Sequence, residues 1–162
     1  MLSYKYATGG KTGYTEIARR TLVTTGSKND MNCRLTVLSG FEDHMKMVAG
    51  NYYKTSEEVS KQAKPEKDVI SLDANSKYTC VVSAALLEKS KYYVGQTLEF
   101  DDYVCKNGKP LQITITGVFE EKESEGSYWV NPPLWYTTHL FVSEEMMSEI
   151  LDDIALEEFS IQ

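Results

Sequence analysis

Few residues in this sequence have the types and spacing that catalysis needs. A hydrolase needs a nucleophile beside a base and an orienting group, or a metal that supplies the attacking water. The chain has only two histidines, His44 and His139, and it lacks the GxSxG, SxxK and HExxH motifs. We therefore predict a protein that is not an enzyme and that needs neither a cofactor nor a metal ion.

One catalytic alternative stays open, a hydrolase in which Cys105 or Ser83 acts with His139. A catalytic thiol would react with labelling reagents near neutral pH, which tests Cys105. A solvated side chain is nevertheless expected for His44, and a structural role for His139. His44 is predicted on the exposed face of a short helix beside Asp43, and His139 is predicted at the start of a strand.

The three cysteines, Cys33, Cys80 and Cys105, include no CxxC pair, so no zinc site with recognisable ligand spacing is expected. Cys80 lies in an apolar run, and Cys33 alternates with apolar residues. These positions predict small buried side chains. The cysteines leave open whether any disulfide forms and which redox compartment the protein occupies.

Composition limits the classes of partner. The 162 residues suffice for one domain or two small lobes, with 41% hydrophobic and 25% charged residues. Lys and Arg total 17 against 24 Asp and Glu, a net charge of −7. That charge repels phosphate backbones and anionic lipids, so we expect no binding to nucleic acid. The longest nearly apolar run, residues 80–87, is far shorter than the ~20 residues that cross a bilayer.

The strongest candidate for a binding site is aromatic. The irregular stretch 120–136 begins with an acidic segment, residues 120–126, and continues with aromatic residues around two prolines. The candidate binding residues, which include both tryptophans of the chain, are Tyr128, Trp129, Trp135 and Tyr136. Trp and Tyr carry binding hot spots, and acidic charge favours a basic partner such as a cationic peptide. The alternative is that these rings fold back over the core as a lid.

Hydrophobic periodicity predicts the elements that must position these residues. Residues 1–20 are weakly patterned, and their glycine-rich part, residues 8–13, is expected to form a loop. Asn107-Gly108 predicts a tight hairpin turn in which both residues have positive φ. After it, residues 111–117 predict a strand with one buried face. Further strands are expected at 21–25, 31–37, 78–83, 93–100 and 138–142.

Short helices are expected between these strands. One has its apolar stripe at Phe41, Met45 and Val48 and is ended by Gly50. Thr55 and Glu58 form a capping box that opens a second helix through Ala63. Two further helices begin after the caps Ser83 and Ser143, and the last of them has an apolar face of Met147, Ile150, Leu151 and Ile154. The predicted fold class is α+β, with antiparallel β-hairpins and short helices.

The order of several segments resembles the extracytoplasmic domain of MacB-like and FtsX-like ABC transporter permeases. Gly50-Asn51-Tyr52-Tyr53 resembles the family's G-x-Y-F element, and Val81-Val82-Ser83-x-x-Leu86 its VVIS-x-x-LA segment. Residues 93–98 resemble xVGDTLxL, although Gln96 stands where Asp is usual. Residues 113–119 resemble xxVVGVx, and Leu140-Phe141-Val142-Ser143 resembles the strand before the helix that returns to the membrane.

The resemblance implies a domain on the extracytoplasmic face of the cell membrane, between two transmembrane helices of a permease. Its partners would be those transmembrane helices, a second permease copy and, indirectly, a cytoplasmic ATPase. Residues 40–136 would match an inserted small α+β lobe. Residues 1–39 and 137–162 would supply a porter-like lobe, reduced because these flanks are short. The acidic segment 120–126 is not a feature of the family.

The resemblance thus implies a non-catalytic domain that couples ATP-driven motion to recognition of a substrate or partner. An extracytoplasmic protein or a cationic peptide would contact the aromatic loop. The alternative is a free-standing soluble binding module, secreted or cytosolic, that uses the same loop, residues 127–136.

Overall fold

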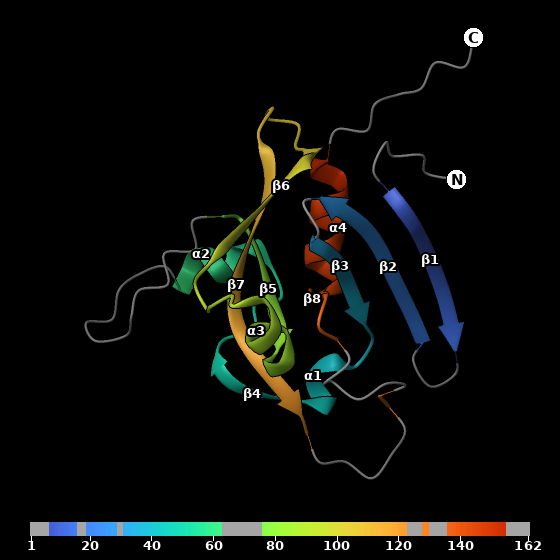
Figure 1. Ribbon diagram of the computed structural model, residues 1–162, viewed down its shortest axis with the longest axis vertical. Helices are drawn as coiled ribbons and strands as arrows, with labels where there is room; N and C mark the ends of the chain where they lie inside the picture. Colours follow the sequence, from blue (N-terminus) through green and yellow to red (C-terminus); the bar gives the residue numbers. More distant parts are fainter. Residues whose placement is uncertain are drawn as a thin grey trace.

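A mixed sheet of eight strands organises the part of the chain that the computed structural model describes, residues 7–15, 19–28, 31–62, 76–122, 128–129 and 136–154 (Figure 1). The strands are β1 (Ala7–Thr15), β2 (Arg19–Lys28), β3 (Met31–Leu38), β4 (Met45–Gly50), β5 (Tyr78–Ser83), β6 (Thr97–Val104), β7 (Pro110–Glu121) and β8 (His139–Phe141). Their order is β1-β2-β3-β8-β5-β7-β4, and β6 also pairs with β7. The predicted α+β class is confirmed.

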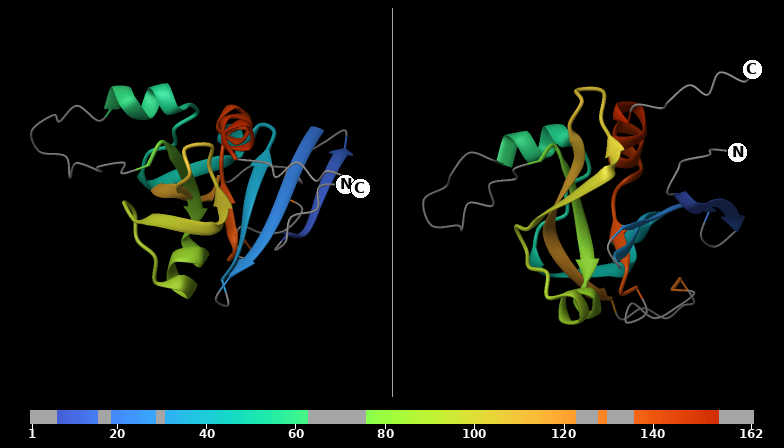
Figure 2. Two further views of the ribbon diagram at one scale, coloured as in Figure 1. Left: turned by 90° about the horizontal axis from the view of Figure 1, so that it is seen from above. Right: turned by 45° about the horizontal axis from the view of Figure 1, so that its top comes forward.

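Antiparallel and parallel pairings both occur in this sheet. The expected hairpins are present, since β2 pairs antiparallel with β3 and β6 pairs antiparallel with β7. Strand β1, which was not expected, pairs antiparallel with β2. The structure adds two parallel pairs, β3 with β8 and β5 with β7. The short β8 therefore joins the N-terminal strands to the rest of the sheet. In both figures β1 and β2 lie at the opposite end of the molecule from α2 (Figures 1 and 2).

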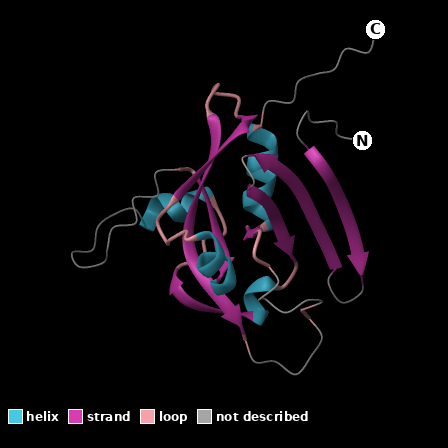
Figure 3. Ribbon diagram, viewed as in Figure 1, coloured by secondary structure: helices cyan, strands magenta, loops and turns pink. Residues whose placement is uncertain are grey.

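Four helices lie among the described residues, α1 (Phe41–His44), α2 (Ser56–Gln62), α3 (Ala84–Ser90) and α4 (Glu144–Asp153) (Figure 3). Three of the predicted caps are confirmed. In the capping box, the Glu58 amide donates to Thr55 Oγ1 at 3.2 Å and the Thr55 amide donates to Glu58 Oε2 at 3.0 Å. Ser83 and Ser143 each accept a bond from the first turn of the following helix. No described helix is both long enough and apolar enough to span a membrane.

Strand β7 is buried on both of its faces, which corrects the prediction of one buried face. Every residue from Ile113 to Phe119 is buried. A β-bulge lies in its pairing with β5, where Cys80 is opposite Ile115 but the next residue, Val81, is opposite Gly117. The extra residue, Thr116, reverses which side chains point to each face. Phe119 therefore reaches the face opposite to that of Ile115.

The two faces carry two hydrophobic clusters. The second cluster consists of Phe41, Val81, Phe119 and Phe141. The first cluster is larger and consists of Val37, Val59, Tyr78, Cys80, Val82, Leu86, Leu98, Cys105, Leu111, Ile113, Ile115, Val118, Leu140, Val142, Met146, Met147, Ile150 and Ile154. It combines residues from 1–39 and 137–162 with residues from 40–136. The division into two lobes stays a prediction.

The helix expected after Phe41 is wrong beyond its first turn. Helix α1 ends at His44, and the next six residues form β4, which pairs with the end of β7 from Met45 opposite Glu121 to Gly50 opposite Gly117. The backbone hydrogen bonds that residues 45–50 form with β7 therefore outweigh their weak helical pattern of apolar residues. Val48 lies at an irregularity between Met47 and Ala49, which leaves its side chain 49% exposed.

The expected loop at residues 8–13 is also wrong, because this segment lies within β1 and pairs with β2. Backbone hydrogen bonds between strands need no particular side chains, so a glycine-rich segment can pair once a partner is beside it.

The predicted apolar face of α4 needs one change. Leu151, which was expected on that face, is 38% exposed, whereas Met146, which was not, is buried.

The hairpin turn differs in detail from the expected two-residue turn. Gly108 alone has a positive φ, +78°, and Asn107 does not. The Cys105 amide donates to the Lys109 carbonyl at 2.9 Å, so three residues form the loop. Such loops place glycine at the left-handed position.

Gly50 provides a direct test of the close approach between β4 and β7. Its φ is +72°, and a β-carbon there would overlap the carbonyl oxygen of Thr116. We expect Gly50→Ala to lower the free energy of unfolding by about 3 kcal/mol or more. Gly108→Ala is the matched control, because its φ is similar but a β-carbon there meets nothing within 4 Å. It should cost only about 1–2 kcal/mol. Equal losses in urea unfolding would contradict the steric argument.

Candidate functional site

The predicted binding residues lie over the second hydrophobic cluster. Trp129 stacks on Phe119 with ring centroids 5.9 Å apart, and Tyr136 meets Phe141 edge-on at 5.4 Å. Trp129 and Tyr136 also contact each other, at 5.9 Å. Trp135 lies outside the described residues. The three described rings, those of Tyr128, Trp129 and Tyr136, are half-buried and are called the aromatic cluster below.

The polar atoms of two of these rings bond to the chain itself. Tyr128 donates its hydroxyl hydrogen to the Ser39 carbonyl at 3.0 Å, and Trp129 Nε1 donates to the His44 carbonyl at 3.3 Å. Ser39 lies just before α1 and His44 is its last residue, so these bonds hold the cluster against that helix. Buried Tyr and Trp side chains usually find such partners. The aromatic cluster therefore covers the core, as the lid alternative expects, while the rings keep part of their surface exposed.

His44 does not lie on a solvated helix face, which corrects the sequence prediction. Its ring stacks on Tyr128, with centroids 3.8 Å apart and planes at 14°. Its Nδ1 atom is buried and has no hydrogen-bond partner among the described residues. Burial, together with Tyr136 and Asp43, raises the pKa of Tyr128 to about 12. Tyr128 is thus a neutral, packed ring at physiological pH.

His139 begins β8 as expected and lies at the other side of the aromatic cluster. Its ring and that of Tyr136 form a T-shaped pair with a centroid distance of 4.9 Å. Burial and the charge of Arg34 lower the pKa of His139 to about 4. The imidazole is therefore neutral at pH 7. Both histidines of the chain contact tyrosines of the aromatic cluster, an arrangement that their sequence positions did not indicate.

The groups of the hydrolase alternative have structural environments. Cys105 is buried, and burial and Asp153 raise its thiol pKa, which disfavours the reactive thiolate. Ser83 donates to the Tyr136 carbonyl at 3.1 Å and accepts from the Leu86 amide. Cys80 is buried as predicted, whereas Cys33 is half-buried. The described residues contain no group of three or more His, Cys, Asp or Glu arranged to hold a metal ion.

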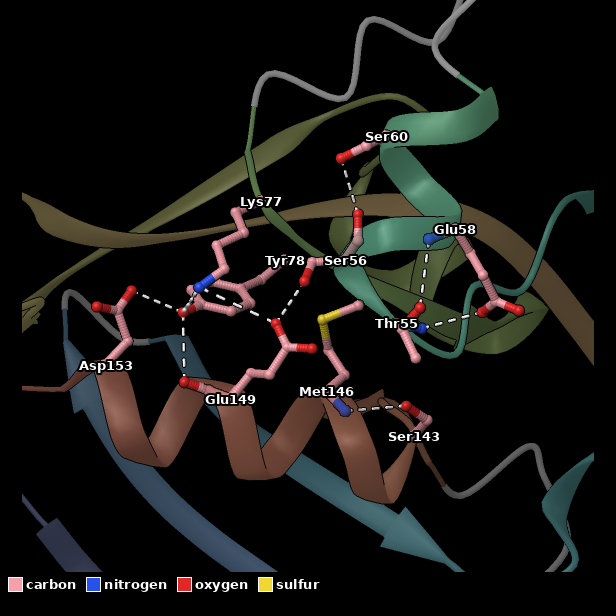
Figure 4. Close-up of polar contacts among 10 residues, drawn as sticks. All are labelled: Thr55, Ser56, Glu58, Ser60, Lys77, Tyr78, Ser143, Met146, Glu149 and Asp153. Carbon is pink, nitrogen blue, oxygen red and sulfur yellow. Dashed lines mark hydrogen bonds and ion pairs between the residues drawn. The ribbon is translucent and has the colours of Figure 1, made fainter.

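A polar network that the sequence reasoning missed joins α2, β5 and α4 (Figure 4). Its members are Ser56, Lys77, Tyr78, Glu149 and Asp153. Tyr78 donates its hydroxyl hydrogen to Asp153 Oδ2 at 2.6 Å and accepts from Lys77 Nζ at 3.1 Å. Ser56 donates to Glu149, whose carboxylate lies 4.0 Å from Lys77 Nζ. The sequence contains one sign of this network, the spacing of Glu149 and Asp153, which places them one helical turn apart.

This network is suited to holding elements together. Burial and the bond to Asp153 raise the pKa of Tyr78 well above its usual value, so its proton stays on the hydroxyl. An open cleft of about 570 Å³ adjoins it, lined by Ser56, Glu57, Ser60, Lys61 and Lys77. Lys61 lies 3.8 Å from Glu57, so charges of both signs line this cleft. The charges that line the cleft therefore favour neither an anionic nor a cationic ligand.

In comparisons with protein families, curated proteins and solved structures, no family model, protein or structure matched this chain.

The tyrosine of the polar network gives a second stability test. We expect Tyr78→Phe to lower the free energy of unfolding by about 1–3 kcal/mol, because Asp153 and Lys77 lose their shared partner inside a part-buried network. Tyr93→Phe is the matched control, since Tyr93 is 63% exposed and its hydroxyl should contribute almost nothing. Urea denaturation followed by circular dichroism measures both. Indistinguishable midpoints for the two variants would contradict a stabilising role for the network.

Proposed function

We propose that this chain is a non-catalytic extracytoplasmic domain of a MacB-like or FtsX-like ABC transporter permease. In this role it couples ATP-driven motion to recognition of a substrate or partner outside the membrane. The parent permease's transmembrane helices and a second permease copy are its direct partners, and the cytoplasmic ATPase acts on it indirectly. Residues 40–136 form the inserted lobe of this proposal, with 1–39 and 137–162 as the reduced porter-like lobe.

One observation carries the proposal. The five segments that resemble the family are separated in the sequence but adjoin one another in the sheet. Gly50 and Val81 both pair with Gly117, one on each side of β7. Thr97 pairs with Thr114, and Phe141 pairs with Val81. The resembling segments therefore form one continuous part of the sheet, as they would in a single inserted domain, and this supports the proposal.

The placement of the outermost described elements is compatible with a domain inserted between two membrane helices. Strand β1 begins, and α4 ends, toward the same end of the molecule (Figure 1). A domain inserted in this way needs both of its connections on the side that faces the membrane.

The aromatic cluster is the contact surface in this proposal. Trp129 and Tyr136 present half-exposed rings, and two exposed carboxylates, Glu120 and Glu121, end the neighbouring strand β7. Aromatic rings beside acidic residues suit a cationic peptide or a basic extracytoplasmic protein. The free-standing soluble binding module remains the second candidate, because it would use the same half-exposed rings within residues 127–136.

The gene tests the permease proposal. We expect the reading frame to encode one apolar stretch of ~20 residues before this chain and three such stretches after it. Sequencing the gene on both sides of codons 1 and 162 measures this. A frame that begins at codon 1 and stops after codon 162 would overturn the permease proposal and favour the soluble module.

The contact surface is tested with decalysine as a cationic probe. Trp135→Ala should raise the Kd at least about fivefold, as expected for a hot-spot tryptophan, and Glu121→Gln should raise it about threefold at low salt. Glu57→Gln is the control, because this carboxylate is also exposed but lies on α2. Calorimetry measures all three. If Glu121→Gln and Glu57→Gln raise the Kd equally, decalysine responds to the net charge of the protein and not to a surface at the aromatic cluster. Unfolding by Trp135→Ala would favour the lid interpretation.

A further inference from the structure

The aromatic cluster is held at both sides by the only two histidines of the chain. His44 stacks on Tyr128, and His139 meets Tyr136 edge-on. Trp129 lies between them, 5.2 Å from Tyr128 and 5.9 Å from Tyr136 by ring centroids. Histidine is the side chain whose ordinary pKa, about 6.5, places its change of charge close to physiological pH. An imidazole ring therefore contacts the cluster on each side.

The surroundings of His139 disfavour its charged form. Arg34 of β3 is its direct partner in the parallel ladder, and Lys89 of α3 reaches Thr137, two residues away, at 3.3 Å. Thr138 Oγ1 lies 3.5 Å from His139 Nδ1. The other neighbours are rings, Tyr136 and Phe141. Among the described residues, Arg34 is the charged side chain that affects the pKa of His139, and its positive charge disfavours a second one.

We propose that protonation of His139 loosens the aromatic cluster, so that mild acid exposes Trp129 and Tyr136. The contacts that this change would break include those of Trp129 with Phe119 and of Tyr136 with Phe141. The Trp129 bond to the His44 carbonyl would open with them. The backbone bonds that hold β8 to β3, such as the one from the Val142 amide to the Thr36 carbonyl, remain in place.

The direction of the pH effect follows from proton linkage. In the packed cluster, burial and Arg34 lower the pKa of His139 to about 4, against 6.5 for a free imidazole. The loosened state therefore binds more protons than the packed state as the pH falls from 6.5 towards 4. Its population rises over that interval and levels off below pH 4. Because part of the ring is exposed, we expect a change of roughly 10- to 100-fold in the equilibrium.

His44 is not the trigger in this proposal. Its ring lies nearly parallel to that of Tyr128, and Asp43 is its neighbour in the chain. Trp129 bonds to the backbone carbonyl of His44, which carries no titratable proton, so this bond does not depend on the His44 ring. The two histidines thus provide a trigger and a matched control within one cluster.

Hydrogen exchange of the Trp129 indole N–H tests the proposal, because this group must leave the His44 carbonyl when the cluster loosens. In a Trp135→Phe background Trp129 is the only tryptophan, so its indole signal is unambiguous by NMR. We expect its protection, corrected for the intrinsic exchange rate, to fall about 10- to 100-fold between pH 6.5 and pH 4. The amides of β7 should keep their protection over the same range.

Variants separate the trigger from general acid effects. His139→Phe keeps a ring against Tyr136 but cannot be protonated, so the protection of the Trp129 indole should no longer depend on pH. His44→Phe should behave like the parent. Arg34→Gln, at an exposed position on β3, removes the positive charge beside His139 and should reduce the pH effect. This variant replaces His139→Phe as the test if His139→Phe does not fold. The proposal fails if the parent shows no loss of protection, if β7 amides lose protection equally, or if both His139→Phe and Arg34→Gln behave like the parent.

Discussion

The bulge at Thr116 is the constraint on which the rest of this structure depends. Strand β7 is the most enclosed strand, with β5 along one side and β4 and β6 along different halves of the other. One extra residue on β7 lets Ile113 and Ile115 fill one hydrophobic cluster and Phe119 fill the other. Without it, the parity of the strand would place Phe119 on the same face as Ile115. The two-sided core therefore follows from a single irregularity in pairing.

The two faces are covered by different means. On the first face, α4 contributes Met146, Met147 and Ile150, and the polar network fastens its far end to β5 through Tyr78 and Asp153. Asp153 also accepts from the Lys106 amide, so the same residue holds the β6–β7 hairpin. On the second face, α1 is a single turn, and half-buried rings complete the cover. The first cover is a well-anchored helix, whereas the second depends on rings that contact titratable side chains.

This asymmetry is the physical basis for placing function at the aromatic cluster. Because its rings are half-buried, this cover keeps aromatic surface available for a partner, which is why we propose it as the contact surface. The permease proposal gives such a surface a context, since a domain that transmits motion needs a firm body and a responsive surface. The polar network and α4 provide the first, and the aromatic cluster provides the second.

The sequence by itself determined the local features. The capping box at Thr55, the caps at Ser83 and Ser143, and most strands depend on neighbours within a few residues, so pattern and propensity were enough to predict them. It also identified the aromatic residues as a group. Only the tertiary structure decided where Met45–Gly50 and Ala7–Thr15 pair, because a strand's partner lies far away in the chain. For the same reason, only packing could bring His44 and His139 to opposite sides of one aromatic cluster and join Tyr78 to Asp153.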